Sequence, residues 1–323
     1  MDTIQPTAVS EGVASMTCRS CWHHGPFRLI KTREMLCGLR QEFFYGECPA
    51  CGSLGIQTIP TNLADYYPSD YYSFHAPPRR PKRPKPGSTV LSQWLLQSNS
   101  FAGRQLIGAL KRKYPFFQWC RLAQCGLNSR ILDVGCGSGG LLRRMQRHGF
   151  SNLTGVDPYA PTEIEEPGFL LKRAELEAAP GSYDLIMMHH VLEHVADPDA
   201  LLRAARAKLN PGGKVLVRIP LAASLSWRTY RENWFNLDPP RHLLVPSQAG
   251  FVSLAGRVGF RVGYIGWDGS EIAYLMSENY RKGISYQERK HESYWRRVRF
   301  RRLANAANRR GQGDQGIFLL ETD

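Results

Sequence analysis

Histidines gather at one place in this chain of 323 residues. His189, His190 and His194 stand close to Glu193, directly after an apolar run that predicts a buried strand. A further histidine, His242, ends the stretch Asp-Pro-Pro-Arg-His. Imidazole is the side chain that most often takes a proton in catalysis near neutral pH. His190, His194 and His242 are therefore the candidate catalytic bases.

Part of this cluster also matches a zinc-peptidase pattern, because residues 190–194 have the spacing His-x-x-Glu-His. The surrounding sequence argues against a peptidase. The pattern lies at the tip of a predicted strand, within an alternation of strands and helices that predicts a doubly wound sheet.

Two Cys-x-x-Cys pairs near the N-terminus have the spacing of a zinc site. Each pair can form a tight knuckle that directs two thiolates at one tetrahedral ion. The four predicted ligands are Cys18, Cys21, Cys48 and Cys51. Four protein ligands leave no open position, which predicts a structural zinc. An alternative ligand set would use His23 or His24.

A glycine-rich turn follows the apolar run Ile131–Val134, with glycines at Gly135, Gly137 and Gly139. Leucines then recur at helical spacing. A strand, a glycine turn and a helix form the unit that binds adenosine-containing cofactors, because glycine takes positive φ and lets a ligand approach the backbone. Asp157 ends a second short strand about twenty residues later, where an acid usually binds ribose hydroxyls.

These stretches resemble the class I S-adenosylmethionine-dependent methyltransferases. The resemblance covers roughly residues 129–266 and a last strand near the C-terminus. The matching motifs, in the family's order, are Asp133-Val-Gly-Cys-Gly-Ser-Gly139, Thr154-Gly-Val-Asp157, Tyr183-Asp-Leu-Ile186, Val191-Leu-Glu-His-Val195 and Leu209-Asn-Pro-Gly-Gly213. The Gly-x-Gly-x-Gly spacing differs from the Gly-x-Gly-x-x-Gly of dinucleotide-binding domains. The resemblance implies an α/β fold: a doubly wound, mostly parallel, seven-stranded Rossmann-like sheet with a small N-terminal zinc ribbon.

The resemblance also implies a cofactor, S-adenosyl-L-methionine, and the residues that bind it. Those residues are Asp133, Gly135, Gly137, Gly139, Asp157, Pro158, Glu175, Leu176 and His189. Whether Glu175 or Glu177 corresponds to the family's adenine-binding acid stays open. Some family members hold a divalent metal at the acceptor hydroxyl with a Glu-x-x-Glu-His cluster. The residues available here for such a second metal are His190, Glu193, His194 and His242.

Composition and resemblance together predict the domain organisation. The expected segments are a zinc-ribbon and tyrosine-rich part (1–76), a Pro/Lys/Arg linker (77–87), capping helices (88–128) and a methyltransferase domain (129–323) with a basic insertion (268–312). The tyrosines of 65–74 resemble the front end of a methyltransferase subset, many of whose members act on sugars, polysaccharides or secondary metabolites. We expect these tyrosines, and Trp234 with Phe235, near the acceptor.

The net charge of +14 indicates an anionic partner, such as RNA, an acidic membrane surface or a phosphate-bearing substrate. Residues 1–15 lack the pattern of a secretory signal, and no apolar run has the length of a membrane span. The 8 cysteines do not form a disulfide-like framework, which favours a reducing cytoplasm.

Three hypotheses follow for function. The first is O-methylation of a sugar, polysaccharide or related small metabolite with a histidine base. The second is methylation of tRNA or rRNA, with the zinc ribbon and basic insertion holding the nucleic acid. The third is a binding scaffold that keeps the fold without turnover, which the intact cofactor motifs disfavour.

Overall fold

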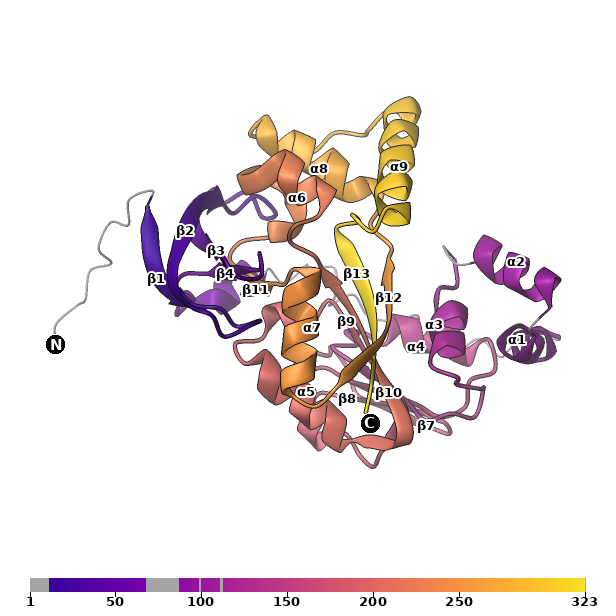
Figure 1. Ribbon diagram of the computed structural model, residues 1–323. Coiled ribbons are helices and arrows are strands. Elements are labelled where there is room, and N and C mark those ends of the chain that lie inside the picture. The colour runs from indigo at the N-terminus through magenta and orange to yellow at the C-terminus, as the bar shows by residue number, and fades with distance from the viewer. Residues whose placement is uncertain (1–11, 68–86, 99, 111–112, 323) are drawn as a thin grey trace. The chain divides into compact units, whose positions relative to one another are not determined.

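The computed structural model describes residues 12–67, 87–98, 100–110 and 113–322 (Figure 1). It divides the chain into two compact units, each assembled from separated segments. Unit 1 holds the described residues up to Tyr66 together with Pro220–Leu254 and Trp267–Asp314. Unit 2 holds the described residues of Tyr67–Ile219, Ala255–Gly266 and Gln315–Asp323. Most of the linker expected at 77–87, and the tyrosines after Tyr67, lie outside the described residues.

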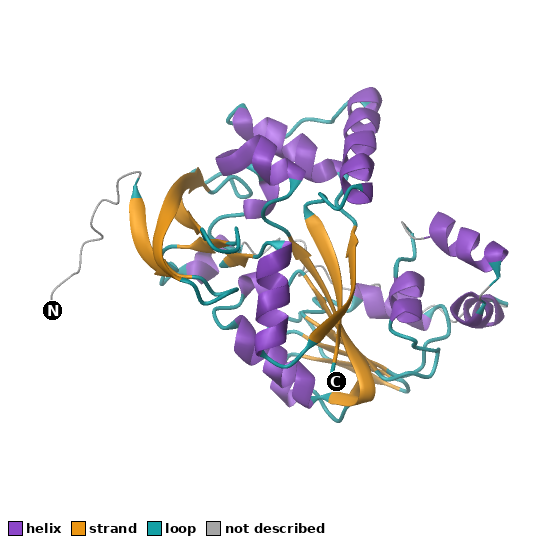
Figure 2. Ribbon diagram, in the orientation of Figure 1, coloured by secondary structure: helices purple, strands orange, loops and turns teal. Residues whose placement is uncertain are grey.

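Unit 2 is built on a mixed sheet with strand order β12-β13-β10-β9-β5-β6-β8-β7 (Figures 1 and 2). The four central pairings, from β10 to β8, are parallel. The strands are β5 (Ile131–Val134), β6 (Leu153–Val156), β7 (Ile164–Glu166), β8 (Phe169–Lys172), β9 (Tyr183–His189), β10 (Leu209–Pro220), β12 (Arg261–Trp267) and β13 (Gln315–Glu321). All four residues of β5 are buried, as expected for a parallel strand covered on both faces. The predicted fold class is confirmed.

The strand count is one higher than predicted, since the described part of this sheet has eight strands. The additional strand is β7, which pairs antiparallel with β8 through a hairpin at Gly168. Gly168 has φ +73°, and a Cβ there would lie 2.1 Å from the carbonyl oxygen of Ser151. Three residues are too few to show the alternation that identifies a strand from sequence. β10 begins within the Leu-Asn-Pro-Gly-Gly motif, and its pairing with β9 shifts register between Leu209 and Lys214.

Three helices lie between residues 88 and 122, within the stretch 88–128 where capping helices were expected. They are α1 (Ser88–Gln97), α2 (Phe101–Leu110) and α3 (Phe116–Leu122), and the other helices of unit 2 include α4 (Gly140–Gln146) and α5 (Pro198–Ala207). Pro115 begins α3, consistent with its fixed φ. Phe116, Phe117 and Trp119 of α3 join the main core of the unit with residues of β5, β9 and α4.

Unit 1 contains a five-stranded antiparallel sheet with order β1-β2-β3-β4-β11. Its strands are β1 (Val13–Thr17), β2 (His24–Arg33), β3 (Glu42–Glu47), β4 (Leu54–Ile56) and β11 (Leu244–Val245). Its helices include α6 (Leu225–Tyr230), α8 (Glu271–Arg281) and α9 (Tyr294–Arg309), and α7 (Gln248–Arg257) begins in this unit. Tyr45 of β3 packs in one core with Trp227 and Trp234. The predicted ribbon therefore shares a hydrophobic core with segments far along the chain. The domain organisation expected from the sequence does not show this sharing.

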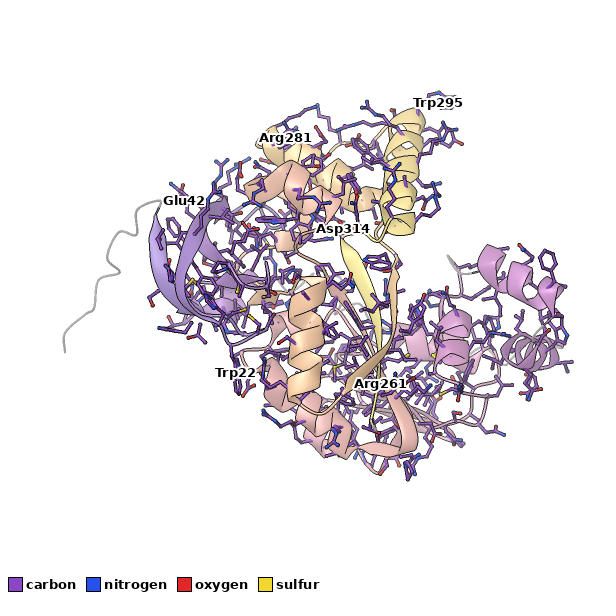
Figure 3. The ribbon with its side chains drawn as sticks, viewed as in Figure 1. Trp22, Glu42, Arg261, Arg281, Trp295 and Asp314 are labelled. Atoms are coloured by element: carbon purple, nitrogen blue, oxygen red, sulfur yellow. The ribbon has the colours of Figure 1, made fainter. Side chains whose placement is uncertain are left out.

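The expected basic insertion, 268–312, contains all of α8 and α9. Several of its arginines are paired: Arg301 lies 2.7 Å from the buried Glu271, and Arg296 lies 2.6 Å from Glu292. In the sequence, a helical stripe is predicted by the spacing of Tyr294, Trp295, Val298 and Leu303. The structure instead buries Phe300, Ala304 and Ala307 of α9. Figure 3 shows Trp295 at the far end of α9, and 77% of its surface is exposed.

Among the described residues, no helix is both long enough and apolar enough to cross a lipid bilayer.

Candidate functional site

The glycine turn of unit 2 joins β5 to α4. Gly135, Gly137 and Gly139 have φ of +68°, +54° and +74°, in the region that favours glycine. A Cβ on Gly139 would lie 2.6 Å from a methyl carbon of Leu171, and one on Gly135 would lie 2.5 Å from a methyl carbon of Val191. Both backbone conformation and packing therefore require glycine at these positions.

Asp157, at the carboxyl end of β6, is hydrogen-bonded to this turn. One carboxylate oxygen accepts from the amide of Gly137 at 2.8 Å, and the other accepts from the amide of Tyr159 at 2.8 Å. The acid and the turn that the sequence analysis linked are thus adjacent. Each carboxylate oxygen keeps a second lone pair, so Asp157 can hold the turn and still accept from ribose hydroxyls.

Asp133 lies on β5, just before the turn, and only 3% of its surface is exposed. Burial raises the pKa of its carboxyl to about 8, and the charge of Asp157 adds to the shift. At neutral pH this carboxyl is mainly protonated, so it can donate a hydrogen bond. The two acids of the site consequently differ in charge, with Asp157 accepting from backbone amides and Asp133 buried in its neutral form.

The segment after β8 contains the other residues expected at the cofactor. Leu176 is buried, whereas Glu175 and Glu177 are exposed on either side of it. Pro158 and Tyr159, which follow Asp157, are also exposed. The exposure of both glutamates leaves open which of them would meet an adenine.

His189 ends β9 and packs against an aromatic ring that sequence reasoning missed. Its ring centre lies 4.5 Å from that of Trp119 on α3. Both ring nitrogens are buried without a hydrogen-bond partner among the described residues. Burial, with the charge of Arg218, lowers the pKa of His189 well below its usual range, so the ring is neutral. Trp119 lies in the stretch 88–128 where capping helices were expected, but no local signal singled out this residue.

His190 is held by two neighbours and has φ +58°, unusual for a residue other than glycine. Its Nδ1 lies 3.0 Å from the buried carboxylate of Glu193, which can only accept when ionised. Its Nε2 lies 2.5 Å from the side-chain amide nitrogen of Gln315. With Glu193 ionised, the proton sits on Nδ1, and Nε2 accepts from Gln315. No local sequence signal links His190 to Gln315, which lies at the start of β13.

His194 has a tyrosine as its neighbour. Its Nδ1 lies 3.1 Å from the hydroxyl of Tyr67, within hydrogen-bond distance. Tyr67 belongs to the tyrosine-rich segment that we expected near the acceptor. A phenol can donate to the ring or accept from it, so both neutral tautomers of His194 are compatible with this contact.

In unit 1, the stretch Asp-Pro-Pro-Arg-His has two separate roles. The Nδ1 of His242 lies 2.8 Å from the carbonyl oxygen of Asn236, which can only accept, so Nδ1 carries a proton. In the neutral ring, Nε2 then bears the lone pair, 3.9 Å from a carboxylate oxygen of Asp238. His242 is 7% exposed.

Arg241, the preceding residue, is fully buried. Its guanidinium lies 2.8 Å from the carboxylate of Glu34 and 2.6 Å from that of Asp238, and it donates to the carbonyl oxygen of Tyr66 at 3.0 Å. Glu34 also accepts from backbone amides of the loop after β2. Arg241 therefore joins the ribbon to the segment before β11, a role that sequence reasoning missed.

The four predicted zinc ligands of unit 1 come together. Their sulfur atoms all lie within 4.8 Å of one another, with Cys18 to Cys51 at 3.6 Å and Cys21 to Cys48 at 3.7 Å. A tetrahedron with zinc–sulfur bonds of about 2.3 Å has edges of about 3.8 Å, so the thiols fit that ion. His24 hydrogen-bonds Thr17 at 2.9 Å and does not belong to this cluster.

Trp234 and Phe235 differ from the expectation that they line an acceptor site. Trp234 is 1% exposed and packs against Trp227 in the core of unit 1. Phe235 is half-buried and stacks on Tyr286 with ring centres 6.0 Å apart.

A parallel α/β sheet whose glycine turn is tied to an acid on the next strand defines the class of adenosyl-cofactor domains. Residues 102–264 match the family model described as "Methyltransferase domain". This match covers half of the chain, and the chain belongs to that family. The predicted recognition of an S-adenosylmethionine-dependent methyltransferase domain is confirmed.

Curated relatives carry the name ubiquinone biosynthesis O-methyltransferase. One from Aeromonas salmonicida is 36% identical over 141 residues, which are 40% of this chain and 57% of the relative. One from Sodalis glossinidius is 38% identical over 97 residues, 26% of this chain and 39% of the relative. The chain thus spans about half the length, or less, of these relatives. Their names give no support to the RNA alternative.

Solved structures of similar fold include magnesium protoporphyrin IX methyltransferase from Synechocystis PCC 6803 with bound SAH. It is 14% identical at a TM-score of 0.40, covering 73% of this chain and 96% of the other. An S-adenosylmethionine-dependent methyltransferase from Mesorhizobium loti is 18% identical at 0.43, covering 65% and 99%. At these TM-scores, the two structures add no support to the family match.

Proposed function

We propose that this chain transfers a methyl group from S-adenosylmethionine to a hydroxyl oxygen of a small-molecule acceptor, such as a sugar, a polysaccharide unit or a related metabolite. The observation that carries the proposal is the hydrogen bond between Asp157 and the Gly137 amide, which sets a carboxylate beside a glycine turn. The name of the curated relatives supports oxygen as the acceptor atom. Their aligned stretches leave the acceptor itself to be identified.

The residues of unit 2 fit the cofactor. Asp157 would accept hydrogen bonds from ribose hydroxyls, and the turn from Gly135 to Gly139 would let the amino-acid end approach the backbone. Glu175 or Glu177, together with Leu176, would border the adenine, as the resemblance implies, and Pro158 would lie near the cofactor. The neutral His189 adds no positive charge near a cationic ligand. When bound, S-adenosylmethionine supplies an electrophilic methyl carbon on a positively charged sulfur.

The chain must align the acceptor oxygen with that carbon, and this positioning supplies much of the acceleration of a displacement. The oxygen–carbon bond forms as the carbon–sulfur bond breaks, and the hydroxyl proton passes to a base. His194 and His242 are the proposed bases. His242 has its lone pair on Nε2, and one tautomer of His194 does too. His190 is a weaker candidate, because its Nδ1 proton is directed at Glu193 and its Nε2 already accepts from Gln315.

The four-cysteine cluster is proposed to hold zinc. The supporting observation is the fit of the sulfur separations to a tetrahedral ion. Four thiolates would complete its coordination, so the metal would supply folding energy and take no part in methyl transfer.

Calorimetric titration with S-adenosylmethionine and transfer of labelled methyl into fractionated extract test the function. Asp157→Ala should weaken cofactor binding at least about tenfold, because a charge-assisted contact to ribose is lost. His194→Ala or His242→Ala should slow transfer about 100-fold, the usual size of a general-base effect, with cofactor affinity unchanged. His291→Ala, at an exposed position, is the matched control.

Normal turnover in both the His194 and His242 variants would remove the proposed base. Absence of binding heat for the unmodified protein would remove the cofactor assignment itself.

A further inference from the structure

Large apolar side chains are exposed on the two helices that precede the core of unit 2. Val90 and Phe101 are 74% and 71% exposed, and Leu91, Trp94 and Leu106 are each at least 36% exposed. Single exposed apolar residues are common on proteins and need no explanation. Five on one pair of neighbouring helices form a patch of the kind that marks a binding surface.

These residues follow helical spacing, so each helix has an outward apolar face. On α1, Val90 and Trp94 are one turn apart, whereas Ser92 and Leu95 are buried on the inner side. On α2, Ala102, Leu106 and Ala109 recur one turn apart and are exposed. Each helix thus has apolar residues on its outer face as well as on the side that packs inward, where Leu95 and Ile107 are buried.

The patch is held in place by the rest of unit 2. Arg121 of α3 donates to the carbonyl oxygens of Leu95 and Ser98, at 2.9 and 2.5 Å, and so fixes the end of α1. Ser92 lies 3.4 Å from a ring nitrogen of His148, which follows α4. Figure 1 shows α1 and α2 on the outer side of α3 and α4, away from the strands of unit 2.

The charge around the patch has a single sign. The sequence has no Asp or Glu between Asp70 and Asp133. Two described basic residues lie beside the helices: Lys113 follows α2 and is exposed, and Arg121 of α3 lies at the end of α1. An exposed apolar helical face in a basic stretch of sequence without acidic residues is the pattern that binds the interface of an anionic bilayer.

Two other occupants fit less well. A second copy of the chain would bring two positively charged stretches together, which costs free energy. RNA would use basic residues and aromatic rings, but exposed aliphatic side chains such as Val90, Leu91 and Leu106 gain nothing from a phosphate backbone.

We infer that the outer face of α1 and α2 docks on an anionic phospholipid surface. The apolar side chains of the patch enter the boundary between headgroups and acyl chains, and the positive charge of this stretch attracts the lipid phosphates. This inference goes beyond the proposed methyl transfer and does not depend on which acceptor is used.

Vesicle flotation of the full chain tests it, with vesicles of equal phosphatidylcholine and phosphatidylglycerol compared with pure phosphatidylcholine. The unmodified protein should float with the anionic vesicles and much less with the neutral ones, and added salt should reduce binding because it screens the charges. Trp94→Ser combined with Phe101→Ser should weaken the partition at least about tenfold, since each side chain contributes apolar area at the interface.

The matched control is Tyr294→Ser combined with Trp295→Ser, which removes two exposed aromatic residues from α9. It should float like the unmodified protein, and circular dichroism with a melting curve should show that both variants are folded. No flotation of the unmodified protein with anionic vesicles would overturn the inference. Equal loss in the control would overturn it too, as would light scattering showing a dimer that Phe101→Ser dissociates. Salt-sensitive RNA binding lost in the Trp94/Phe101 variant, without vesicle binding, would assign the patch to nucleic acid instead.

Discussion

The two units hold their functional residues in different ways. In unit 2, Asp157 bonds an amide only 20 residues earlier, across adjacent parallel strands. In unit 1, Arg241 bonds Glu34, 207 residues earlier. The cofactor edge is therefore determined by one local strand, turn and helix unit, whereas the ribbon depends on side chains from distant segments. A local motif is visible in sequence, and a long-range contact is not.

The difference extends to what stabilises each unit. Unit 2 has a parallel sheet whose central strands are buried, and hydrophobic packing can support it. The sheet of unit 1 has short strands such as β4 and β11. Its cysteine cluster and its buried ion pairs therefore have to supply part of the stability that hydrophobic packing supplies in unit 2. We therefore expect single substitutions at these clusters to affect unit 1 more than single glycine changes affect unit 2.

The largest expected effect is loss of the metal cluster. Cys48→Ser removes one of four thiols, and we expect zinc content to fall and stability to drop by more than about 4 kcal/mol, as when a structural metal is lost. Metal analysis and thermal melting with and without a chelator measure both. Cys37→Ser is the matched control, because Cys37 lies outside the cluster and should keep the metal. Full stability without bound metal would show that the thiols need no ion.

The buried arginine should come next. Arg241→Met leaves Glu34 and Asp238 without their buried partner and should cost about 3–5 kcal/mol. Arg281→Met is the control, because Arg281 pairs with Glu278 at 3.6 Å on the surface (labelled in Figure 3) and should cost at most about 1 kcal/mol. Denaturant unfolding measures both. Equal costs would contradict the idea that unit 1 depends on the buried pair.

Sequence reasoning predicted the parts of the molecule whose signals are local. The strand Ile131–Val134, the glycines and the two Cys-x-x-Cys pairs each carry their geometry within a few residues, and the structure has them as elements or clusters. β7 was not predicted, because a strand of three residues is too short to show an alternation of apolar and polar side chains. The stripe on α9 was misplaced because Trp295 is as apolar as a core residue although it is exposed.

The candidate site was predictable only in part for the same reason. Asp157 and the turn follow from motif spacing, but the neighbours of the histidines do not. Gln315 reaches His190 because β13 returns to the sheet, and Trp119 reaches His189 because α3 packs against the end of β9. Such neighbours depend on topology, which a single sequence does not specify.

Within unit 2, the glycine turn should tolerate an alanine substitution less well than the first residue of the helix that follows it. Gly139→Ala forces a Cβ against Leu171 at positive φ and should cost about 2 kcal/mol, with weaker cofactor binding. Gly140→Ala is the neighbouring control: a Cβ there meets no atom within 4 Å, and alanine favours a helix. Thermal melting and calorimetric titration compare them. A harmless Gly139→Ala would mean that the turn is looser than its packing indicates.

The effect expected to be smallest per pH unit is a pH dependence that separates the units. Burial is the main cause that raises the pKa of Asp133 in unit 2 to about 8 and that of Asp314 in unit 1 to about 6. An unfolded aspartate titrates near about 4. Between that value and its folded pKa, each acid keeps a proton that the unfolded chain has lost, so stability falls as pH rises.

Of these two acids, only Asp133 should therefore lower the stability as the pH rises from 6 to 8. The decrease should be no more than about 1.4 kcal/mol per pH unit. Asp133→Asn should flatten the stability profile in that window, measured without cofactor by denaturant unfolding. Asp314→Asn, the matched control, should leave that window unchanged and flatten the profile from about pH 4 to 6 instead. If both variants changed the same window, the two buried acids would not have different folded pKa values, and the electrostatic contrast between the cofactor edge and the core of unit 1 would be lost.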